Sequence, residues 1–486
     1  MDKYNIYIKQ NHLLPAILIS GLIGIVISLI NNSLLIFGII ISLPFLFTLI
    51  TSIVKRPIIL FYTLFIINYY IMGTTRYMNI SGISVIMDVL LILIVLLIII
   101  HAALLNNIEW KRAFNILTLG SLIWMIYTSI EIINPTGLFE GWYLSRGLVF
   151  NGFIITIIVS LLCNRYQIVK TLTLIFSILV LTAIFKAFMQ KFLGFDTGER
   201  KWLNNGGALT HIIGTGTRYF SFFTDAGNFG SNMGYAFILF GITALYTKNV
   251  AYKIYFAIIS ILSMYAMLLS GTRGAMIVPL GGLLLYTIIC KNIKAMAFGG
   301  VCLLFIYVFF AFTMIGQGNQ QIRRMRTAFR PSEDASFNVR KENQKKLGLY
   351  LKTKPFGEGL GLSGVENQKL SKRLTTAIPH DSWYVKVWVE TGIVGITLHL
   401  AMIFGAIARG AWILMFKIKD TELKGRLTGY LCGIFGMFLS AYGNAFWGQY
   451  PTYIIAFTGI TFVLCGEYFD KEIENNKNLS KNKNII

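Results

Sequence analysis

A histidine at the end of a long polar segment is the first candidate for chemistry in this sequence. His380 lies in the run IPHDSWY at positions 378–384, just before the chain turns apolar again near Glu390. Most of the chain is apolar, so a titratable ring at the junction between a polar and an apolar segment requires an explanation. Histidine exchanges a proton near neutral pH, and His380 is therefore a candidate general base.

Arginines at other boundaries are candidates for binding an anion. Arg273 stands in SGTRGA between two apolar stretches, where an arginine is costly unless it is paired or faces a cavity. Its flanking glycines favour close approach of the backbone to a ligand, and an arginine that only snorkels to the headgroups is the alternative. Arg218 stands in GTRYF and is followed by Asp225 and Asn228, whose polar groups suit sugar hydroxyls. Arg146, which lies just before the sixth apolar stretch, is a further candidate.

These residue types fit the transfer of a sugar from a lipid diphosphate. The leaving diphosphate gains negative charge in the transition state, and arginines such as Arg218 and Arg273 stabilise that charge bidentately. A histidine can remove the proton from an acceptor hydroxyl as the hydroxyl attacks the anomeric carbon. Arginines that neutralise the diphosphate make a metal unnecessary, and the sequence shows no metal-ligand cluster of His, Asp and Glu. We therefore predict neither a metal nor a cofactor.

The composition indicates what must position these residues. The chain has 486 residues, of which 55% are hydrophobic and 13% charged, with a mean hydropathy of +0.66. Long apolar runs recur along its length, which predicts an all-α polytopic bundle of about 12–14 transmembrane helices. The spans are expected at approximately 13–30, 34–54, 57–73, 83–105, 113–132, 148–163, 171–191, 233–247, 254–270, 275–290, 295–315, 385–416, 427–445 and 450–468. Asp88, inside an early apolar stretch, is predicted to be a buried and satisfied polar residue.

The spans and the polar segments between them predict four parts. They are a transmembrane bundle over 1–315 that includes an outward loop at 192–232, a large extracytoplasmic loop at 316–384, transmembrane helices at 385–468 and a cytoplasmic tail at 469–486.

The lysines and arginines predict the orientation. The connections expected on one side are short and basic, and most short connections on the other side carry almost no charge, so the positive-inside rule puts both termini in the cytoplasm. The net charge of +22 follows largely from these loops and does not indicate nucleic acid.

The basic part of the outward loop 316–384 has two interpretations. It contains Arg340 on a helix expected from about Val339 to Leu351, together with further arginines and lysines. An extracytoplasmic cluster of this kind suggests an anionic partner such as a diphosphate. The alternative is an amphipathic helix that lies on anionic lipid.

The motifs, taken in order, resemble the O-antigen ligase/polymerase superfamily of bacterial membrane glycosyltransferases. The matching pieces are GTR at Arg218, SGTRG at Arg273, Arg340 followed by PFGEG, then HDSWY at His380, and ETGIVG from Glu390.

The resemblance implies a GT-C-like fold and an inverting, metal-independent transfer from an undecaprenyl-diphosphate-linked glycan at the outer face of the bacterial cytoplasmic membrane. His380 takes the position of the family's base, and Arg218 and Arg273 take its diphosphate-binding positions. Two departures stand out: Asp381 replaces the asparagine that often follows the histidine, and the segment from Asp225 to Asn228 lacks a proline often found there.

Three functions remain open. A polymerase that extends a lipid-linked glycan is slightly favoured over a ligase that moves the finished glycan to lipid A-core, another glycolipid or a protein. A lipid or solute transporter is disfavoured. It would place charged residues near the middle of the membrane and have related halves, whereas here the most prominent charged residues lie at helix ends and no internal repeat is visible. The expected partners are the lipid-linked donor, a glycan or glycolipid acceptor, membrane lipids and a chain-length regulator.

Overall fold

The chain consists of two compact units, Met1–Thr63 and Leu64–Ile486. The computed structural model describes residues 51–78, 82–105, 108–214, 216–291, 293–318, 320–326, 329 and 335–483. Two predicted spans lie outside the described part: 13–30 entirely, and 34–54 except for its last four residues. The account below therefore concerns the second unit.

The described chain is 77% helical, which confirms the all-α prediction. Every span predicted after residue 56 coincides with a helix. These helices are α3 (Ile58–Thr74), α4 (Val85–Leu105), α5 (Ile116–Ile130), α7 (Arg146–Leu162), α8 (Tyr166–Phe192), α11 (Ala226–Tyr246), α12 (Val250–Leu269), α13 (Ile277–Ile289), α14 (Ile293–Phe312), α18 (Trp383–Phe416), α19 (Thr421–Ser440) and α20 (Thr452–Leu464).

Shorter elements complete the chain. They are α6 (Phe139–Leu144), α9 (Thr197–Trp202), α10 (Ala208–His211), α15 (Gln320–Arg326), α16 (Ala335–Leu351), α17 (Leu374–Ala377), α21 (Gly466–Lys483) and the antiparallel pair β1 (Ile212–Ile213) and β2 (Gly216–Thr217), in which Ile212 faces Thr217.

Seven of the described helices are long and apolar enough to cross a membrane, or eight if a bent pair is one span. The prediction of about 12–14 spans covers the whole chain, and its first two spans lie almost entirely outside the described residues. Several of the other predicted spans are short or bent helices. Helices α3 and α13 are shorter than a full crossing, and α20 meets α21 at a bend of 54°. Helix α19 begins with charged residues, including Glu422 and Lys424.

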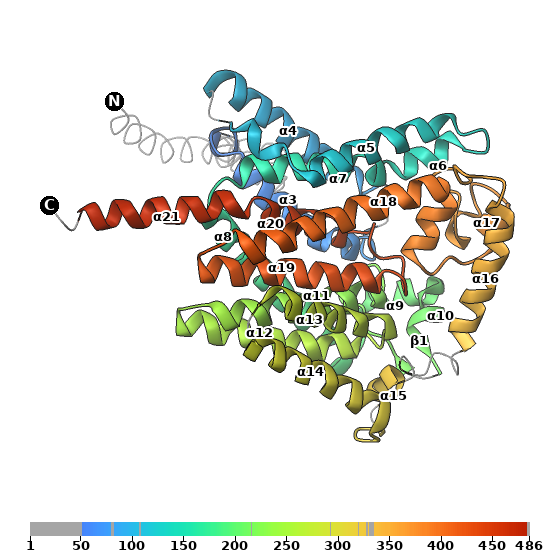
Figure 1. Ribbon diagram of the computed structural model, residues 1–486. Coiled ribbons are helices and arrows are strands. Elements are labelled where there is room, and N and C mark those ends of the chain that lie inside the picture. The colour runs from blue at the N-terminus through green and yellow to red at the C-terminus, as the bar shows by residue number, and fades with distance from the viewer. Residues whose placement is uncertain are drawn as a thin grey trace, which may run out of the picture. The chain divides into compact units, whose positions relative to one another are not determined.

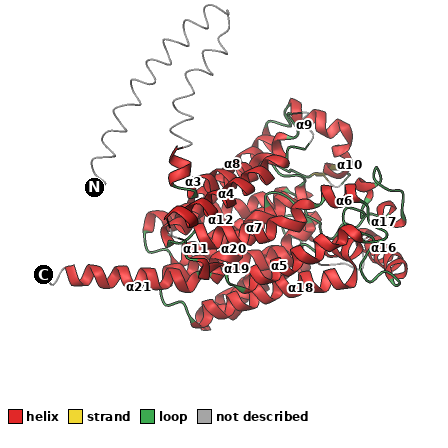
Figure 2. Ribbon diagram, turned by 90° about the horizontal axis from the view of Figure 1, so that it is seen from above, coloured by secondary structure: helices red, strands yellow, loops and turns green. Residues whose placement is uncertain are grey.

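Figures 1 and 2 show the long helices running side by side, with α21 leading away from one end. The opposite end carries α6, α9, α10, α16 and α17 (Figure 1). Helix α11 forms the interior: 78% of its apolar window is buried, against 28% for α4 and for α5. Its first half is rich in glycine, alanine and serine, and small residues let neighbouring transmembrane helices approach closely.

Helix α18 is broken at Gly392, whose φ of +67° lies in the region that favours glycine. The break leaves backbone carbonyls of the preceding turn without their helical partners. The amides of Glu358 and Gly359 donate to the carbonyls of Val389 and Glu390 at 2.8 and 3.1 Å. The run PFGEG therefore docks its backbone on the break, and two motifs that are distant in sequence form one unit.

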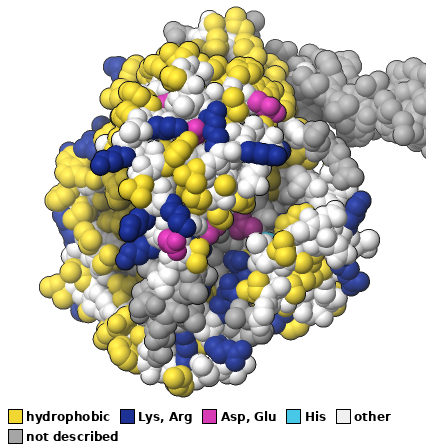
Figure 3. Space-filling view, turned by 90° about the vertical axis from the view of Figure 1, so that its right-hand side faces the viewer, with side chains coloured by type: hydrophobic (Ala, Val, Ile, Leu, Met, Phe, Trp, Pro, Cys, Tyr) yellow, Lys and Arg dark blue, Asp and Glu magenta, His cyan; other side chains and the backbone are white. Residues whose placement is uncertain are grey.

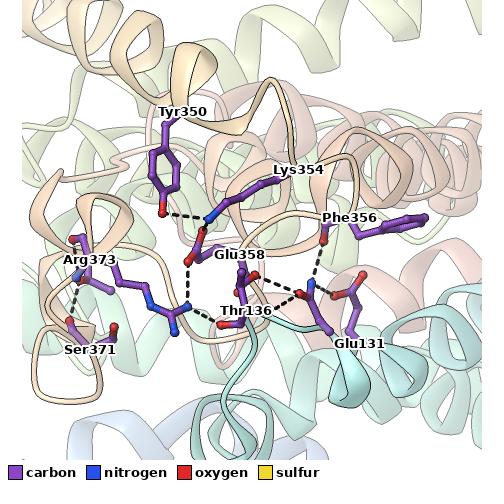
Figure 4. A network of polar contacts seen from close by, with 10 residues as sticks. Glu131, Thr136, Tyr350, Lys354, Phe356, Glu358, Ser371 and Arg373 are labelled. Atoms are coloured by element: carbon purple, nitrogen blue, oxygen red, sulfur yellow. Dashed lines mark hydrogen bonds and ion pairs between the residues drawn. The ribbon is translucent and has the colours of Figure 1, made fainter.

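A buried carboxylate fastens this loop to its surroundings. The side chain of Glu358 is 1% exposed and lies 2.6 Å from Lys354 Nζ and 2.7 Å from Arg373 Nη1 (Figure 4). Arg373 also donates to the carbonyl of Thr136, and the Thr136 hydroxyl donates to the carbonyl of Glu358 at 3.1 Å. Because a buried charge is stable only when it is paired, this network joins the loop to the connection between α5 and α6.

Candidate functional site

A cavity of about 850 Å³ opens at the end of the bundle that carries α16 and α17. Its walls come from the segment between α10 and α11, the start of α13, helices α15 and α16, the turn before α18 and the connection between α19 and α20. Figure 3 shows this end of the molecule, where lysine and arginine side chains gather around a hollow. Segments far apart in sequence thus meet at one place.

Most of the predicted site residues line this cavity. They are Arg218, Asp225, Arg273, Arg340, His380 and Asp381.

Arg146 and Asn228 lie elsewhere. Arg146 lines a separate cavity of about 190 Å³, where its Nε lies 2.7 Å from Asp88 Oδ2. Asp88 is therefore paired, as predicted, but it is half-buried and not fully buried. Asn228 is fully buried. Its side-chain Nδ2 donates to the Thr224 hydroxyl at 3.0 Å and to the carbonyl of Tyr450 at 3.1 Å. Asn228 therefore holds the start of α11 against the connection between α19 and α20.

The Arg218 guanidinium is held in place by two groups of the cavity wall. Its Nη1 donates to the carbonyl of Thr210 at 2.9 Å, and its Nη2 donates to the Thr272 hydroxyl at 2.8 Å. Its Nε is buried and has no hydrogen-bond partner among the described residues. Burial lowers the pKa of Arg218, as do the charges of Arg273 and Arg340, while Asp225 opposes this. An arginine so confined and so close to other cations is suited to an anionic ligand.

Asp225 serves first as the N-terminal cap of α11. Its Oδ1 accepts hydrogen bonds from the amides of Gly227 and Asn228 at 2.6 and 3.0 Å, which satisfies amides that a helix start leaves unpaired. The carboxylate also lines the cavity. It thus orients the wall beside Arg218 and contributes a negative charge to it.

Arg76 positions the segment that carries Arg218 and Asp225. Its guanidinium donates to the carbonyls of Ser221 and Phe223. It also lies 4.4 Å from the ring centre of Phe220, a distance typical of cation–π contact. Burial lowers the pKa of Arg76 to about 10. Arg76 could not be recognised from the sequence, because its partners are backbone carbonyls about 145 positions away.

His380 is the most enclosed titratable group of the predicted site, with 8% of its surface exposed. Its Nε2 lies 3.6 Å from Glu366 Oε1, and its Nδ1 is buried without a hydrogen-bond partner among the described residues. Burial, assisted by the positive charge of Lys386, lowers the pKa of His380 to about 3. The ring is therefore neutral at physiological pH, the form that a general base requires.

Gly364 makes room for this ring. Its φ is +78°, and a Cβ at this position would collide with the His380 imidazole and lie 2.6 Å from Glu366 Oε2. The amide of Gly364 also donates to the carbonyl of Thr375 at 3.0 Å. The backbone of one loop thus fixes both the histidine and the carboxylate beside it.

The charges of the cavity leave a positive excess. Four arginines and one lysine line it, against three carboxylates: Arg218, Arg273, Arg324, Arg340 and Lys341, with Asp225, Glu366 and Asp381. Arg340 and Asp381 form a loose pair, since the Nε to Oδ2 distance is 3.5 Å. Asp381 therefore faces Arg340 on α16, and its carboxylate has no hydrogen bond to the neighbouring His380 ring among the described contacts. The excess of two positive charges suits a diphosphate diester.

Glu366 and His211 also line the cavity and were not among the predicted site residues. Glu366 stands in an unremarkable polar loop, and only the folded chain brings it to His380. His211 lies beside Arg218, and its Nε2 accepts the amide of Ala226 at 3.2 Å while its Nδ1 lies 2.9 Å from the carbonyl of Gly207. Burial lowers the pKa of His211 to about 4. Because both ring nitrogens are engaged by backbone, His211 supports the wall and is not a second base.

The arrangement can bind an anion and accept a proton in one enclosed space. The arginines supply donors for phosphate oxygens, and the neutral imidazole supplies a base. Among the described residues no group of three His, Cys, Asp or Glu side chains is placed to hold a metal ion.

Residues 258–400 match a family model described as O-Antigen ligase. The matched segment contains Arg273, Arg340, His380 and Asp381, whereas Arg218 precedes it. The match confirms the resemblance to the O-antigen ligase/polymerase superfamily. No curated protein matches the chain.

Proposed function

From its O-antigen ligase domain at 258–400, we propose that this protein is a bacterial membrane glycosyltransferase that polymerises a surface polysaccharide. The donor is a glycan linked to undecaprenyl diphosphate, and the acceptor is a sugar hydroxyl of another lipid-linked repeat unit. The observation that carries the proposal is that His380, Arg218 and Arg273 line the same cavity.

In the proposed reaction the acceptor oxygen attacks the anomeric carbon of the donor. A new bond between this carbon and the acceptor oxygen forms as the bond to the phosphate oxygen breaks. The diphosphate leaves with the electron pair, and Arg218 and Arg273 stabilise its growing charge. The hydroxyl proton passes to the His380 ring. Attack opposite to the leaving group inverts the anomeric configuration.

Glu366 has a supporting part in this step. The imidazole becomes a cation when it takes the proton, and a carboxylate near Nε2 stabilises that cation. At 3.6 Å the two groups are too far apart for a hydrogen bond in the resting site. The carboxylate therefore acts on the ring through its charge, which favours the protonated form, and Glu366 is a positioning residue.

A ligase is the second candidate. It would use the same donor and base and differ only in the acceptor, which would be lipid A-core, another glycolipid or a protein. We place the cavity on the extracytoplasmic side of the cytoplasmic membrane, with both termini inside, and a chain-length regulator is a further partner of the polymerase.

Transfer by the purified protein tests the proposal. The donor is a lipid-diphosphate repeat unit, supplied alone and with a candidate acceptor lipid, in the presence of a chelator. The wild type is compared with His380→Ala, and Glu342→Gln is the matched control, because Glu342 is an exposed residue of α16 outside the cavity.

We expect His380→Ala to lose transfer by at least about a hundredfold, the usual share of a general base, while Glu342→Gln keeps full activity. A ladder grown from the donor alone indicates a polymerase, and a single shift that requires the acceptor lipid indicates a ligase. Full transfer by correctly folded His380→Ala would refute the proposed base, and no transfer by the wild type would favour a transporter.

A further inference from the structure

A second basic cavity lies at the opposite end of the bundle, where α21 begins. Its volume is about 480 Å³. It is formed by the 3₁₀ helix Trp110–Ala113 and the start of α5, the last turns of α18 and the junction of α20 with α21. No part of the proposed reaction uses this cavity.

Cations from three different elements point to an anionic ligand. Arg112, Arg409 and Lys471 line the cavity, against a single carboxylate, Glu467. Glu467 Oε1 lies 3.9 Å from Arg409 Nη2, a loose contact between two partly exposed side chains. It therefore does not neutralise the site.

Arg112 is held in place and is not a mobile surface group. Its Nη1 donates to the carbonyl of Asn164 at 2.9 Å, and its Nε lies 2.7 Å from Glu109 Oε2. Its guanidinium also stacks 4.8 Å from the ring centre of Tyr468. A fixed guanidinium beside two freer cations is an arrangement suited to phosphate, which arginine binds through paired donors.

Apolar side chains continue from the cavity along the bundle. Phe114 and Ile116 line it, and Phe114 is 85% exposed. Beyond them α5 leaves a row of large side chains between 42% and 59% exposed, spaced three or four residues apart on one helix face. The row consists of Ile116, Leu119, Ile123, Ile126 and Ile130. A hydrocarbon chain that descends from the cavity can lie along this row.

We propose that this cavity binds the headgroup of an anionic phospholipid. Arg112, Arg409 and Lys471 hold the phosphate, and an acyl chain packs on the exposed face of α5. A basic pocket between transmembrane helices beside an apolar face is the kind of site that recognises such lipids. A free phosphate would use the cations but not the apolar row. The proposal does not depend on the proposed transferase activity.

Native mass spectrometry of the purified full chain tests this site. The protein is mixed with phosphatidylglycerol or phosphatidylcholine at equal concentration, and a parallel sample with phosphatidylglycerol contains excess inorganic phosphate. The variants are Arg409→Gln with Lys471→Gln, and Lys471→Gln alone, since Lys471 is exposed and its loss leaves the fold intact. Lys253→Gln is the matched control, because it removes an exposed cation from the start of α12, outside the cavity.

We expect the wild type and Lys253→Gln to retain phosphatidylglycerol several-fold more than phosphatidylcholine. The double variant should retain the two lipids equally, and Lys471→Gln should lose part of the preference. Equal retention by the wild type, or an unchanged preference in the variants, would overturn the site. Displacement of phosphatidylglycerol by inorganic phosphate would identify a free phosphate as the ligand and overturn the lipid assignment.

Discussion

The environment of His380 determines how a base with this pKa responds to acid. An exposed histidine becomes protonated near pH 6.5, whereas burial and the charge of Lys386 lower the pKa of His380 to about 3. The charged groups around the ring are Glu366 at Nε2, Lys386 one helical turn into α18, and the neighbouring pair of Asp381 and Arg340. The neutral form therefore persists well below neutral pH.

Two substitutions should move the acid limb of the pH profile of kcat/KM in opposite directions. Lys386→Gln removes a charge that lowers the pKa of His380, so the pKa rises and transfer is lost at a higher pH than in the wild type. Glu366→Gln removes the carboxylate that stabilises the imidazolium, so the limb moves to lower pH and kcat/KM falls about tenfold, ~1.4 kcal/mol in the barrier. The pH profiles of purified variants measure both shifts.

The control is Lys369→Gln, an exposed lysine of the same loop as Glu366 that lies outside the cavity. Its profile should match that of the wild type. Parallel shifts of the Glu366→Gln and Lys386→Gln profiles in one direction would show that neither charge acts through His380.

At the scale of elements, the break in α18 and the loop docked on it set the approach to the site. The break at Gly392 allows the PFGEG loop to bond with helix carbonyls, and His380 lies just before the first residue of this helix. A Cβ at Gly392 would run into the carbonyl of Pro355. Gly392→Ala should therefore undock the loop.

We expect Gly392→Ala to lower the thermal unfolding midpoint by several degrees and to reduce transfer. The left-handed conformation alone costs an L-residue about 1–2 kcal/mol, and the collision adds to this cost. Gly405→Ala is the control within the same helix, where the new Cβ meets only Ile116 at 3.4 Å. Equal midpoints for the two variants, measured in the same detergent, would contradict the proposed role of the break.

Hydropathy was enough to predict the helices, because a membrane span must be long and apolar whichever helices it packs against. It does not show which spans are short, as α13 is, or bent, as at the junction of α20 and α21. Arg273 and His380 were recognisable because a charged or titratable group beside apolar sequence requires a reason. Glu366 and Arg76 were not, since their partners depend on how loops fold. The separate place of Arg146 was not visible from the sequence, because its ion pair with Asp88 joins two helices whose contact only the folded chain shows.

At the scale of the whole described unit, the two ends of the bundle differ in where their charged residues lie. The connections at the α21 end are short and basic, with Lys111 and Arg112 before α5, Lys248 before α12 and Lys417 before α19. At the other end the connection between α19 and α20 carries no charge, and the cations gather around the large cavity. The positive-inside rule therefore predicts that the α21 end faces the cytoplasm.

A pair of cysteine variants tests this orientation. Lys369→Cys lies in the loop near His380 and Lys253→Cys at the start of α12, and each replaces an exposed lysine. The background replaces all five native cysteines with serine, although Cys163, Cys432 and Cys465 are buried. A membrane-impermeant maleimide should label Lys369→Cys in right-side-out vesicles and Lys253→Cys only after permeabilisation.

The orientation decides which substrates the two cavities can meet. If the expected labelling is found, the large cavity faces the side to which lipid-linked glycans are translocated, and the second basic cavity lies in the cytoplasmic leaflet, where anionic lipids provide a negative surface. The reverse labelling would put His380 in the cytoplasm, away from translocated donors, and the proposed polymerase or ligase activity could not stand. Because the basic connections and the cavity cations lie at opposite ends, one labelling result tests both assignments together.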